Sequence, residues 1–411
     1  MNRLYEKLAV LAVRRGVNVQ KGQKLVIRSD VRDQAFAQLC AEEAYKAGAG
    51  SVEIDWRDQT LKRLDLEYQT VETLADISDW IHAKEEERQK RKACYLNIVS
   101  DEPGAMKQTD PEKRSAYQRA YSAKMADLQR YTAANEGQWC VLGVPSVKWA
   151  HTVFPELSEE EAFAKLEEAI FAVSRVSEDN DPIADWQKHD ESLQHTAGIL
   201  TEYQFEKVHF YNSLGTDLYV GLVKDHIWVG GGTETPKGVY FDPNIPTEEI
   251  FCMPDKYQTE GIVYASKPLS FNGTLIEDFN ITFHNGKAVE VHAAKEEKVL
   301  QEITGSDEGS AYLGEVALVP YDSPVSKAGF LFYNTLYDEN AACHLALGQC
   351  YAENLKGGLE MSDEDLQKAG GNISREHVDF MFGTADLSAD GIQKDGTAVP
   401  IMRNGNIVLE D

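Results

Sequence analysis

The chain has 411 residues, of which 42% are hydrophobic and 30 are glycines, a composition typical of a folded protein of one or two domains. Its 68 acidic and 41 basic residues give a net charge of −27, which argues against nucleic acids and anionic membranes as partners because both attract basic patches. No stretch approaches the roughly 20 consecutive apolar residues of a transmembrane helix.

The N-terminus and the cysteines indicate a cytoplasmic protein. The longest apolar run near the start, Leu8–Val13, is short for a secretory signal and ends at two arginines. None of the six cysteines forms a CxxC pair, so neither a disulfide framework nor a structural zinc ribbon is expected. We therefore predict a reducing, cytoplasmic compartment.

The first part of the chain alternates between predicted strands and helices. An amphipathic helix opens it at Leu4–Arg14, and an alanine-rich helix at Ala35–Ala47 lies between two short apolar strands. Such a strand–helix–strand order is typical of a parallel βαβ unit. The predicted strands are Lys24–Arg28, Ser51–Asp55, Cys94–Val99 and Trp139–Val144. A long helix is predicted at Asp110–Ala134, and Ser158 with Glu161 forms a capping box that opens a helix ending at Val176.

Strands dominate the sequence from about residue 200 onward. They are predicted at Lys207–Tyr211, Asp217–Val223, Ile227–Gly230, Gly261–Ala265, Thr274–Phe283 and Ala288–Ala293. Helices are predicted at Lys295–Ile303 and Glu339–Asn354, and Asn285-Gly286 and Asn404-Gly405 predict hairpin turns. We therefore predict an α/β protein, with an N-terminal parallel βαβ domain at 1–195 and a strand-rich α+β domain at 196–411.

Two histidines stand out among the ten in the chain. His377 and Asp379 lie two apart in a predicted strand, so their side chains share a face and could bind one divalent ion. On the helix predicted from Glu339, His344 and Tyr351 are seven residues apart and would also share a face. Taken alone, each pattern fits a structural role better than a metal site.

Three glutamates stand in apolar surroundings. Glu315 heads an otherwise apolar strand, where a buried carboxylate needs a cation or strong hydrogen-bond donors. Glu248 and Glu249 enter another strand with their side chains on opposite faces, so at most one of them turns inward. Two histidines and three carboxylates from four elements would suit two divalent ions with a bridging carboxylate, which activate a water and polarise a carbonyl or phosphoryl oxygen.

Four motifs resemble the thermophilic aminopeptidase family of metallopeptidases, which includes aminopeptidases T and S. They are Pro246–Phe251 (PTEEIF), Gly314–Val319 (GEVALV), Asp338–Gly348 (DENAACHLALG) and His377–Met381 (HVDFM). The motifs occur in the order and with the separations of that family, and the resemblance covers most of the chain. It implies a cytoplasmic, metal-dependent aminopeptidase that forms a homodimer, with active sites that open into an internal cavity.

The resemblance also implies the residues of the site, which the second domain would carry. The metal ligands would be Glu249, Glu315, His344, His377 and Asp379. These residues would hold two divalent ions, with Glu315 as the bridging ligand. Because the ligand set is rich in oxygen, the ions could be Zn²⁺, Co²⁺, Mn²⁺ or Mg²⁺. Tyr351 could donate a hydrogen bond to the tetrahedral oxyanion, and either Glu248 or Glu339 could be the general base. The expected reaction removes N-terminal residues from short peptides.

Two other functions remain open at this point. A two-metal phosphoesterase would use similar ligands but would need a basic phosphate clamp, which the nearby Lys256 and Lys327 do not obviously form. A metal-stabilised peptide-binding protein would bind the ions without turnover. Hydrolysis of an aminoacyl-anilide distinguishes the three functions.

Overall fold

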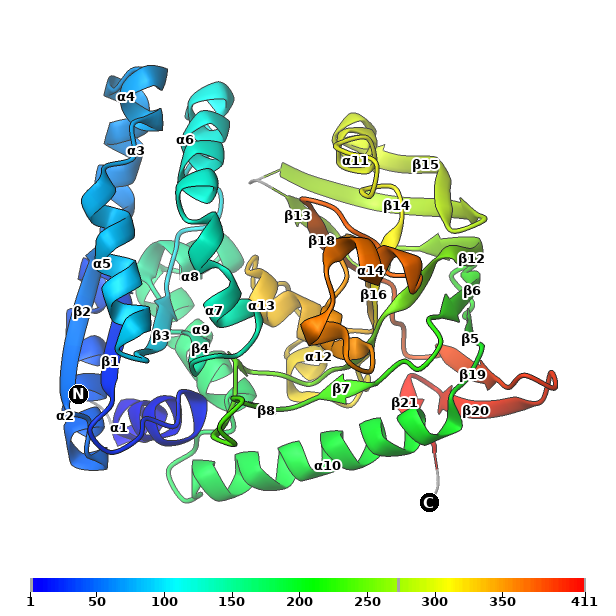
Figure 1. The fold of residues 1–411 in the computed structure, drawn as a ribbon, viewed down its shortest axis with the longest axis horizontal. Coiled ribbons are helices and arrows are strands. Elements are labelled where there is room, and N and C mark those ends of the chain that lie inside the picture. Colours follow the sequence, from blue (N-terminus) through cyan, green and yellow to red (C-terminus); the bar gives the residue numbers. More distant parts are fainter. Residues whose placement is uncertain (1–2, 272–273, 410–411) are drawn as a thin grey trace. The chain divides into compact units, whose positions relative to one another are not determined.

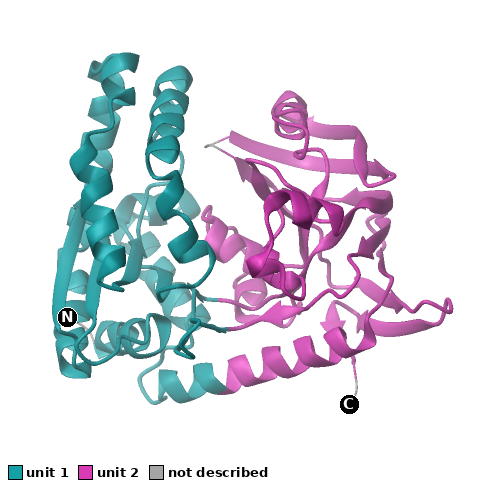
Figure 2. Ribbon diagram, viewed as in Figure 1, with its two compact units in different colours: residues 1–187, 232–246 teal, residues 188–231, 247–411 magenta. Residues whose placement is uncertain are grey.

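The computed structural model describes residues 3–271 and 274–409, and the chain forms two compact units, coloured separately in Figure 2. Unit 1 comprises residues 1–187 and 232–246, and unit 2 comprises residues 188–231 and 247–411. The chain therefore returns to unit 1 for one short segment, which the sequence did not reveal. The predicted domains, 1–195 and 196–411, stay a prediction.

A parallel five-stranded sheet forms the centre of unit 1, in the order β10-β4-β3-β1-β2, of which Figure 1 labels β1 to β4. Its strands are β1 (Lys24–Asp30), β2 (Ser51–Arg57), β3 (Cys94–Val99), β4 (Trp139–Gly143) and β10 (Asn244–Ile245). The first four were predicted, and the parallel βαβ arrangement is confirmed. β10 comes from the returning segment, where β8 (Thr233–Glu234) and β9 (Tyr240–Phe241) also pair.

Helices precede, connect and follow the strands of unit 1 in the sequence. They are α1 (Arg3–Leu11), the π-helix η1 (Ala12–Gly16), η2 (Val31–Asp33), α2 (Gln34–Ala47), α3 (Gln59–Tyr68), α4 (Val71–Ala75), α5 (Asp79–Lys90), α6 (Pro111–Lys124), η3 (Ala126–Leu128), α7 (Arg130–Ala133), α8 (Val147–Val153) and α9 (Glu159–Val173). The long helix predicted at 110–134 is thus divided into α6, η3 and α7. The capping box of Ser158 and Glu161 is present at the start of α9. α10 (Pro182–Tyr203) begins in unit 1 and continues into unit 2.

Unit 2 is rich in antiparallel strands, as predicted. One five-stranded sheet has the order β18-β17-β16-β11-β7. Its strands are β7 (Val229–Gly230), β11 (Ile250–Cys252), β16 (Leu313–Leu318), β17 (His344–Gly348) and β18 (His377–Met381). The strands of a nine-stranded sheet are β5 (Lys207–Tyr211), β6 (Asp217–Leu222), β12 (Pro254–Tyr264), β13 (Leu269–Phe271), β14 (Thr274–His284), β15 (Lys287–Lys295), β19 (Ser388–Ile392), β20 (Ala398–Arg403) and β21 (Asn406–Ile407).

Short helices connect the strands of unit 2. They are α11 (Glu297–Thr304), α12 (Pro324–Ala328), α13 (Thr335–Asp338), η4 (Glu339–Ala341), η5 (Ala352–Asn354), η6 (Gly358–Glu360) and α14 (Asp363–Lys368). The turn between β14 and β15 is the predicted hairpin: Asn285 and Gly286 have φ values of +49° and +79°. None of the helices in the described parts of the chain combines the length and the apolar character needed to cross a bilayer.

The prediction of a helix at 339–354 is wrong. Only the turn η4 is helical at its start, and His344–Gly348 is the strand β17, buried along its whole length between β16 and β18. A strand buried on both faces has a continuous apolar sequence without alternation, which periodicity alone does not distinguish from a buried helix. The alanines of this segment therefore fitted either structure, and the shared helical face predicted for His344 and Tyr351 does not exist.

Candidate metal centre

One face of the five-stranded sheet in unit 2 carries four of the five predicted ligands. Glu315 lies opposite Ala346 and Ala317 opposite His344 in the pairing of β16 with β17. Ala346 in turn lies opposite Asp379 in the pairing of β17 with β18. Residues directly opposite one another point to the same face, so the side chains of Glu315, His344 and Asp379 converge there. The alanines between them leave room for the longer polar side chains.

His377 joins this face at the end of β17, opposite Gly348. Gly348 has a φ of +108°, and a Cβ atom there would lie 2.1 Å from the carbonyl oxygen of Glu376. Glycine is therefore required beside His377. On the other face of the sheet, Val316, Leu345 and Phe380 are buried in the main hydrophobic core of unit 2. The alternation along the three strands thus separates the polar site from the core.

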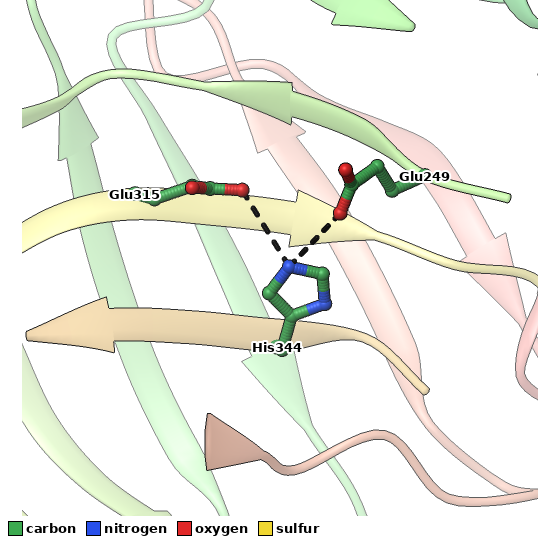
Figure 3. Close-up of side chains that lie close together, drawn as sticks. All are labelled: Glu249, Glu315 and His344. Atoms are coloured by element: carbon green, nitrogen blue, oxygen red, sulfur yellow. Dashed lines mark ion pairs between the residues drawn. The ribbon is translucent and has the colours of Figure 1, made fainter. Parts of the chain in front are cut away.

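Two groups of ligand atoms form on this face, and Glu315 belongs to both. His344 Nε2 lies 3.1 Å from Glu249 Oε2 and 3.5 Å from Glu315 Oε1 (Figure 3). His377 Nε2 lies 3.3 Å from Glu315 Oε2 and 3.3 Å from Asp379 Oδ1. Within each group of three residues, all ligand atoms lie within 4.8 Å of one another. Glu315 therefore contributes a different carboxylate oxygen to each group.

Backbone carbonyl groups orient both imidazole rings. His344 Nδ1 lies 3.2 Å from the carbonyl oxygen of Ala342, and His377 Nδ1 lies 2.8 Å from that of Gln349. A carbonyl oxygen only accepts hydrogen bonds, so each Nδ1 donates and each neutral ring keeps the lone pair on Nε2. Those Nε2 atoms are the ones that face the carboxylates, as ligation of a metal requires.

The protonation of the cluster reflects its burial and its charges. Burial acts to raise the pKa of Glu315, but hydrogen bonds from His344 and His377 outweigh it and lower this pKa to about 2. Burial acts to lower the pKa of His344, but Glu249 and Glu315 raise it well above its usual value. Burial raises the pKa of Glu249, which its hydrogen bond with His344 only partly offsets. Burial and the charge of Glu249 raise the pKa of Glu339 well above the usual carboxyl range.

The donor set fits divalent cations. The four carboxylates Glu249, Glu315, Glu339 and Asp379 interact with one another and with two imidazoles. With all four carboxylates ionised, two negative charges would stay uncompensated even when both imidazoles are protonated, and burying an uncompensated charge is costly. Carboxylate oxygens and imidazole nitrogens are ligands that divalent metals accept. Cations bound by these residues would remove the excess of negative charge.

Tyr351 lies beside the second ligand group, in the loop after β17. Its hydroxyl oxygen is 3.3 Å from His377 Nε2, and its ring packs edge-on against Phe251. The residue as a whole is 42% exposed. Sequence reasoning missed Glu353, two residues further on, whose pKa is raised by burial and by the charge of Glu315. Its proximity to Tyr351 in sequence was the only signal that could have indicated it.

The structure separates the two candidate general bases. Glu339 lies in η4 and interacts electrostatically with Glu249, Asp379, His344 and Glu315. The carboxylate of Glu248 lies 3.5 Å from His189 Nε2 of α10. Glu248 and Glu249 contact different histidines, and both residues precede β11 instead of lying within it. Glu339 is thus part of the cluster, and Glu248 contacts a different histidine.

Comparison with known proteins gives a likeness over nearly the whole chain. The family model described as thermophilic metalloprotease (M29) matches residues 1–407. The chain is 44% identical to aminopeptidase AmpS of Bacillus subtilis, over 97% of each chain, and 40% identical to aminopeptidase T of Thermus thermophilus, over 98% of each. The solved structure of wild-type AmpT from Thermus thermophilus superimposes with a TM-score of 0.93, at 40% identity and over 99% of both chains. The likeness includes every element that carries the cluster.

Proposed function

The chain belongs to the thermophilic metalloprotease (M29) family and is a metallo-aminopeptidase, and from this premise we propose that it removes N-terminal residues from short peptides at a centre of two divalent ions. The observation that supports two ions most directly is that Glu315 offers one carboxylate oxygen to each ligand group. The proposed ligands are Glu249, Glu315, His344, His377 and Asp379. Ions of this kind, when bound, polarise the scissile carbonyl group and lower the pKa of a water molecule.

The side chains around the ligands have distinct roles in this proposal. Glu339 takes a proton from the attacking water as the water oxygen bonds to the carbonyl carbon. It then gives that proton to the leaving amine as the carbon–nitrogen bond breaks, which completes hydrolysis. The Tyr351 hydroxyl donates a hydrogen bond to the oxyanion that develops on the substrate. Glu248 has no part in the proton transfer, because it faces His189.

The wider setting of the enzyme is also part of the proposal. The six cysteines are free and buried, which is consistent with a reducing cytoplasm. The homodimer with enclosed active sites rests on the family resemblance alone. In an enclosed active site, the access of the peptide to the site would limit the length of the substrate, and the chemical step would not.

Chelation tests the proposed dependence on metal. Chelator-treated protein should lose hydrolysis of alanyl-p-nitroanilide and recover it when a divalent ion is added, because carboxylates and imidazoles alone cannot polarise the carbonyl group in the same way. Activity and elemental analysis on the same samples measure this, and a phosphate ester serves as the control for a phosphoesterase. Full activity in protein verified as metal-free would contradict the proposal.

Peptide length tests the enclosed site. With the same N-terminal residue in every substrate, kcat/KM should fall steeply from dipeptides and tripeptides to long peptides and folded proteins, because only short chains reach the site. Release of the free N-terminal amino acid, followed by mass spectrometry, measures it. If a folded protein with an accessible N-terminus were cleaved as fast as a tripeptide, an enclosed site would be ruled out.

A further inference from the structure

Tyr351 lies in a short segment after β17 whose two ends are buried. Cys350 and Leu355 belong to a small hydrophobic cluster of unit 2. Tyr351, between them, is exposed, and the ring of Phe251 packs edge-on against its ring. Burial of Cys350 and Leu355 anchors the segment as a whole, but it does not by itself determine where the hydroxyl group of Tyr351 lies.

A buried asparagine joins this segment to two other parts of unit 2. Asn354 lies in η5 and is only 1% exposed. Its Nδ2 donates hydrogen bonds to the backbone carbonyl oxygens of Phe251 (3.1 Å) and Ile227 (3.2 Å). Its own backbone carbonyl oxygen accepts from the N–H of Ile227 (2.7 Å), and its N–H donates to the carbonyl oxygen of Tyr351 (3.2 Å). Asn354 therefore connects Tyr351 with both Phe251 and Ile227.

Asn354 bridges two segments at the point where their β pairing ends. The pairing of β7 with β11 ends at Val229 and Phe251. Ile227 lies two residues before Val229, outside the strand. A side-chain amide has two N–H donors, whereas the carbonyl groups of Phe251 and Ile227 only accept hydrogen bonds. Asparagine can therefore bond to both carbonyl groups at once, which aspartate or an aliphatic residue cannot do.

The strand β11 relates this bridge to the metal centre. Phe251 lies two residues after Glu249, one of the proposed ligands. The hydroxyl oxygen of Tyr351 lies 3.3 Å from Nε2 of His377, another proposed ligand. Because Asn354 is bonded to the backbone of Phe251, it fixes the turn that carries Tyr351 relative to the strand that follows Glu249.

We propose that Asn354 is a positioning residue for the reaction and that its side-chain amide sets the place of the Tyr351 hydroxyl group. The proposal rests on the function proposed above for Tyr351, which is to donate a hydrogen bond to the oxyanion. Such a donor acts at about 2.7–3.1 Å from the oxyanion. A displacement of about 1 Å can lower the rate by about 10²-fold, even when its cause is a residue that does not touch the substrate.

Asn354→Ala is expected to lower kcat for alanyl-p-nitroanilide by about 10- to 100-fold, with a smaller change in KM and with metal content near that of the wild type. The variant loses both side-chain hydrogen bonds. Asn354→Ser keeps one hydroxyl donor and should lose less of kcat, and it provides the same test if Asn354→Ala does not fold. Steady-state kinetics and elemental analysis of the metal-loaded variants measure these effects. Wild-type kcat in the folded variants would overturn the proposal.

Asn180→Ala is the matched control for a general loss of stability. Asn180 Nδ2 also donates to a backbone carbonyl oxygen, that of Arg175 (2.6 Å), but in unit 1. This variant should keep kcat and KM, and its thermal midpoint shows how much stability one such asparagine contributes. A loss of kcat as large as that in Asn354→Ala would attribute both losses to stability and would overturn the proposal.

A double-mutant cycle with Tyr351→Phe tests whether Asn354 acts through Tyr351. Tyr351→Phe should lower kcat by about 10²–10³-fold, the usual effect of removing one oxyanion donor. In that background no hydroxyl group is left to position, so the addition of Asn354→Ala should cause almost no further loss. Equal losses from Asn354→Ala in both backgrounds would show that it acts independently of Tyr351, and the positioning role would be wrong.

The outcomes separate this proposal from the function on which it rests. Independent effects of the two substitutions would overturn the role of Asn354 alone. Wild-type kcat in Tyr351→Phe would remove Tyr351 from oxyanion stabilisation and overturn the role of Asn354 with it, while the aminopeptidase would remain. Absence of alanyl-p-nitroanilide hydrolysis by metal-loaded wild-type protein would overturn the proposed function itself.

Discussion

Glu315→Gln is expected to lower kcat for alanyl-p-nitroanilide by about 10³-fold or more and to lower the content of both metal ions. The reason is the position of its carboxylate, with Oε1 3.5 Å from His344 Nε2 and Oε2 3.3 Å from His377 Nε2. An amide keeps the shape but loses the charge and one acceptor oxygen, so both ion sites weaken together. Bound ions supply several kcal/mol of transition-state stabilisation, and about 1.4 kcal/mol corresponds to a factor of ten in rate.

A purely structural role for Glu315 predicts a different result. Replacing a buried charge by a neutral isostere would then raise the thermal midpoint and leave the metal content unchanged. Metal stoichiometry, thermal midpoint and kcat on the same variant distinguish the two roles. Two ions retained at normal turnover would remove Glu315 from the centre, and with it the bridge between the ligand groups.

The fold could be predicted where the sequence pattern is local. β1 and β3 are short apolar runs, and α2 between β1 and β2 ends at a glycine, so the parallel βαβ unit followed from composition and period alone. β17 could not be assigned in this way, because its burial on both faces removes the alternation that marks a strand. β10 has two residues and joins the sheet only because the chain returns to unit 1. No local pattern encodes such a return.

The candidate site shows the same limit. The period of a strand was enough to predict that His377 and Asp379 share a face, and their distance of 3.3 Å agrees with it. The residue types alone suggested two ions held by two histidines and three carboxylates. The choice of Glu315 as the shared ligand came from the family resemblance, because the register of β16, β17 and β18 cannot be deduced from spacing. The choice between Glu248 and Glu339 depends on where α10 places His189, which is a tertiary contact. Sequence left that choice open, and the geometry favours Glu339.

Glu339→Gln is expected to lower kcat by about 10²–10⁴-fold, the usual contribution of general acid–base catalysis, while metal content stays near that of the wild type. Glutamine has the shape of glutamate but cannot accept the proton of the attacking water. The turn η4 should persist in this variant, because the side chain of the next residue holds it. Asn340 Nδ2 donates to the carbonyl oxygen of Leu336 (3.0 Å), and Asn340 Oδ1 accepts from the backbone N–H of Glu248 (2.7 Å).

Glu248→Gln is the matched control, because it makes the same chemical change one residue from Glu249 but on the side of His189. It should keep the metal content and most of kcat, since the carboxylate that it removes is paired with His189 and is none of the proposed ligands. Loss of metal in Glu339→Gln would instead indicate that Glu339 is a metal ligand. Glu248→Gln and Glu339→Gln could instead lose kcat equally while both retain metal. That result would assign the proton transfer to Glu248 and His189. Measuring kcat and metal stoichiometry for the two variants side by side therefore identifies the general base, because each assignment predicts a different pair of results.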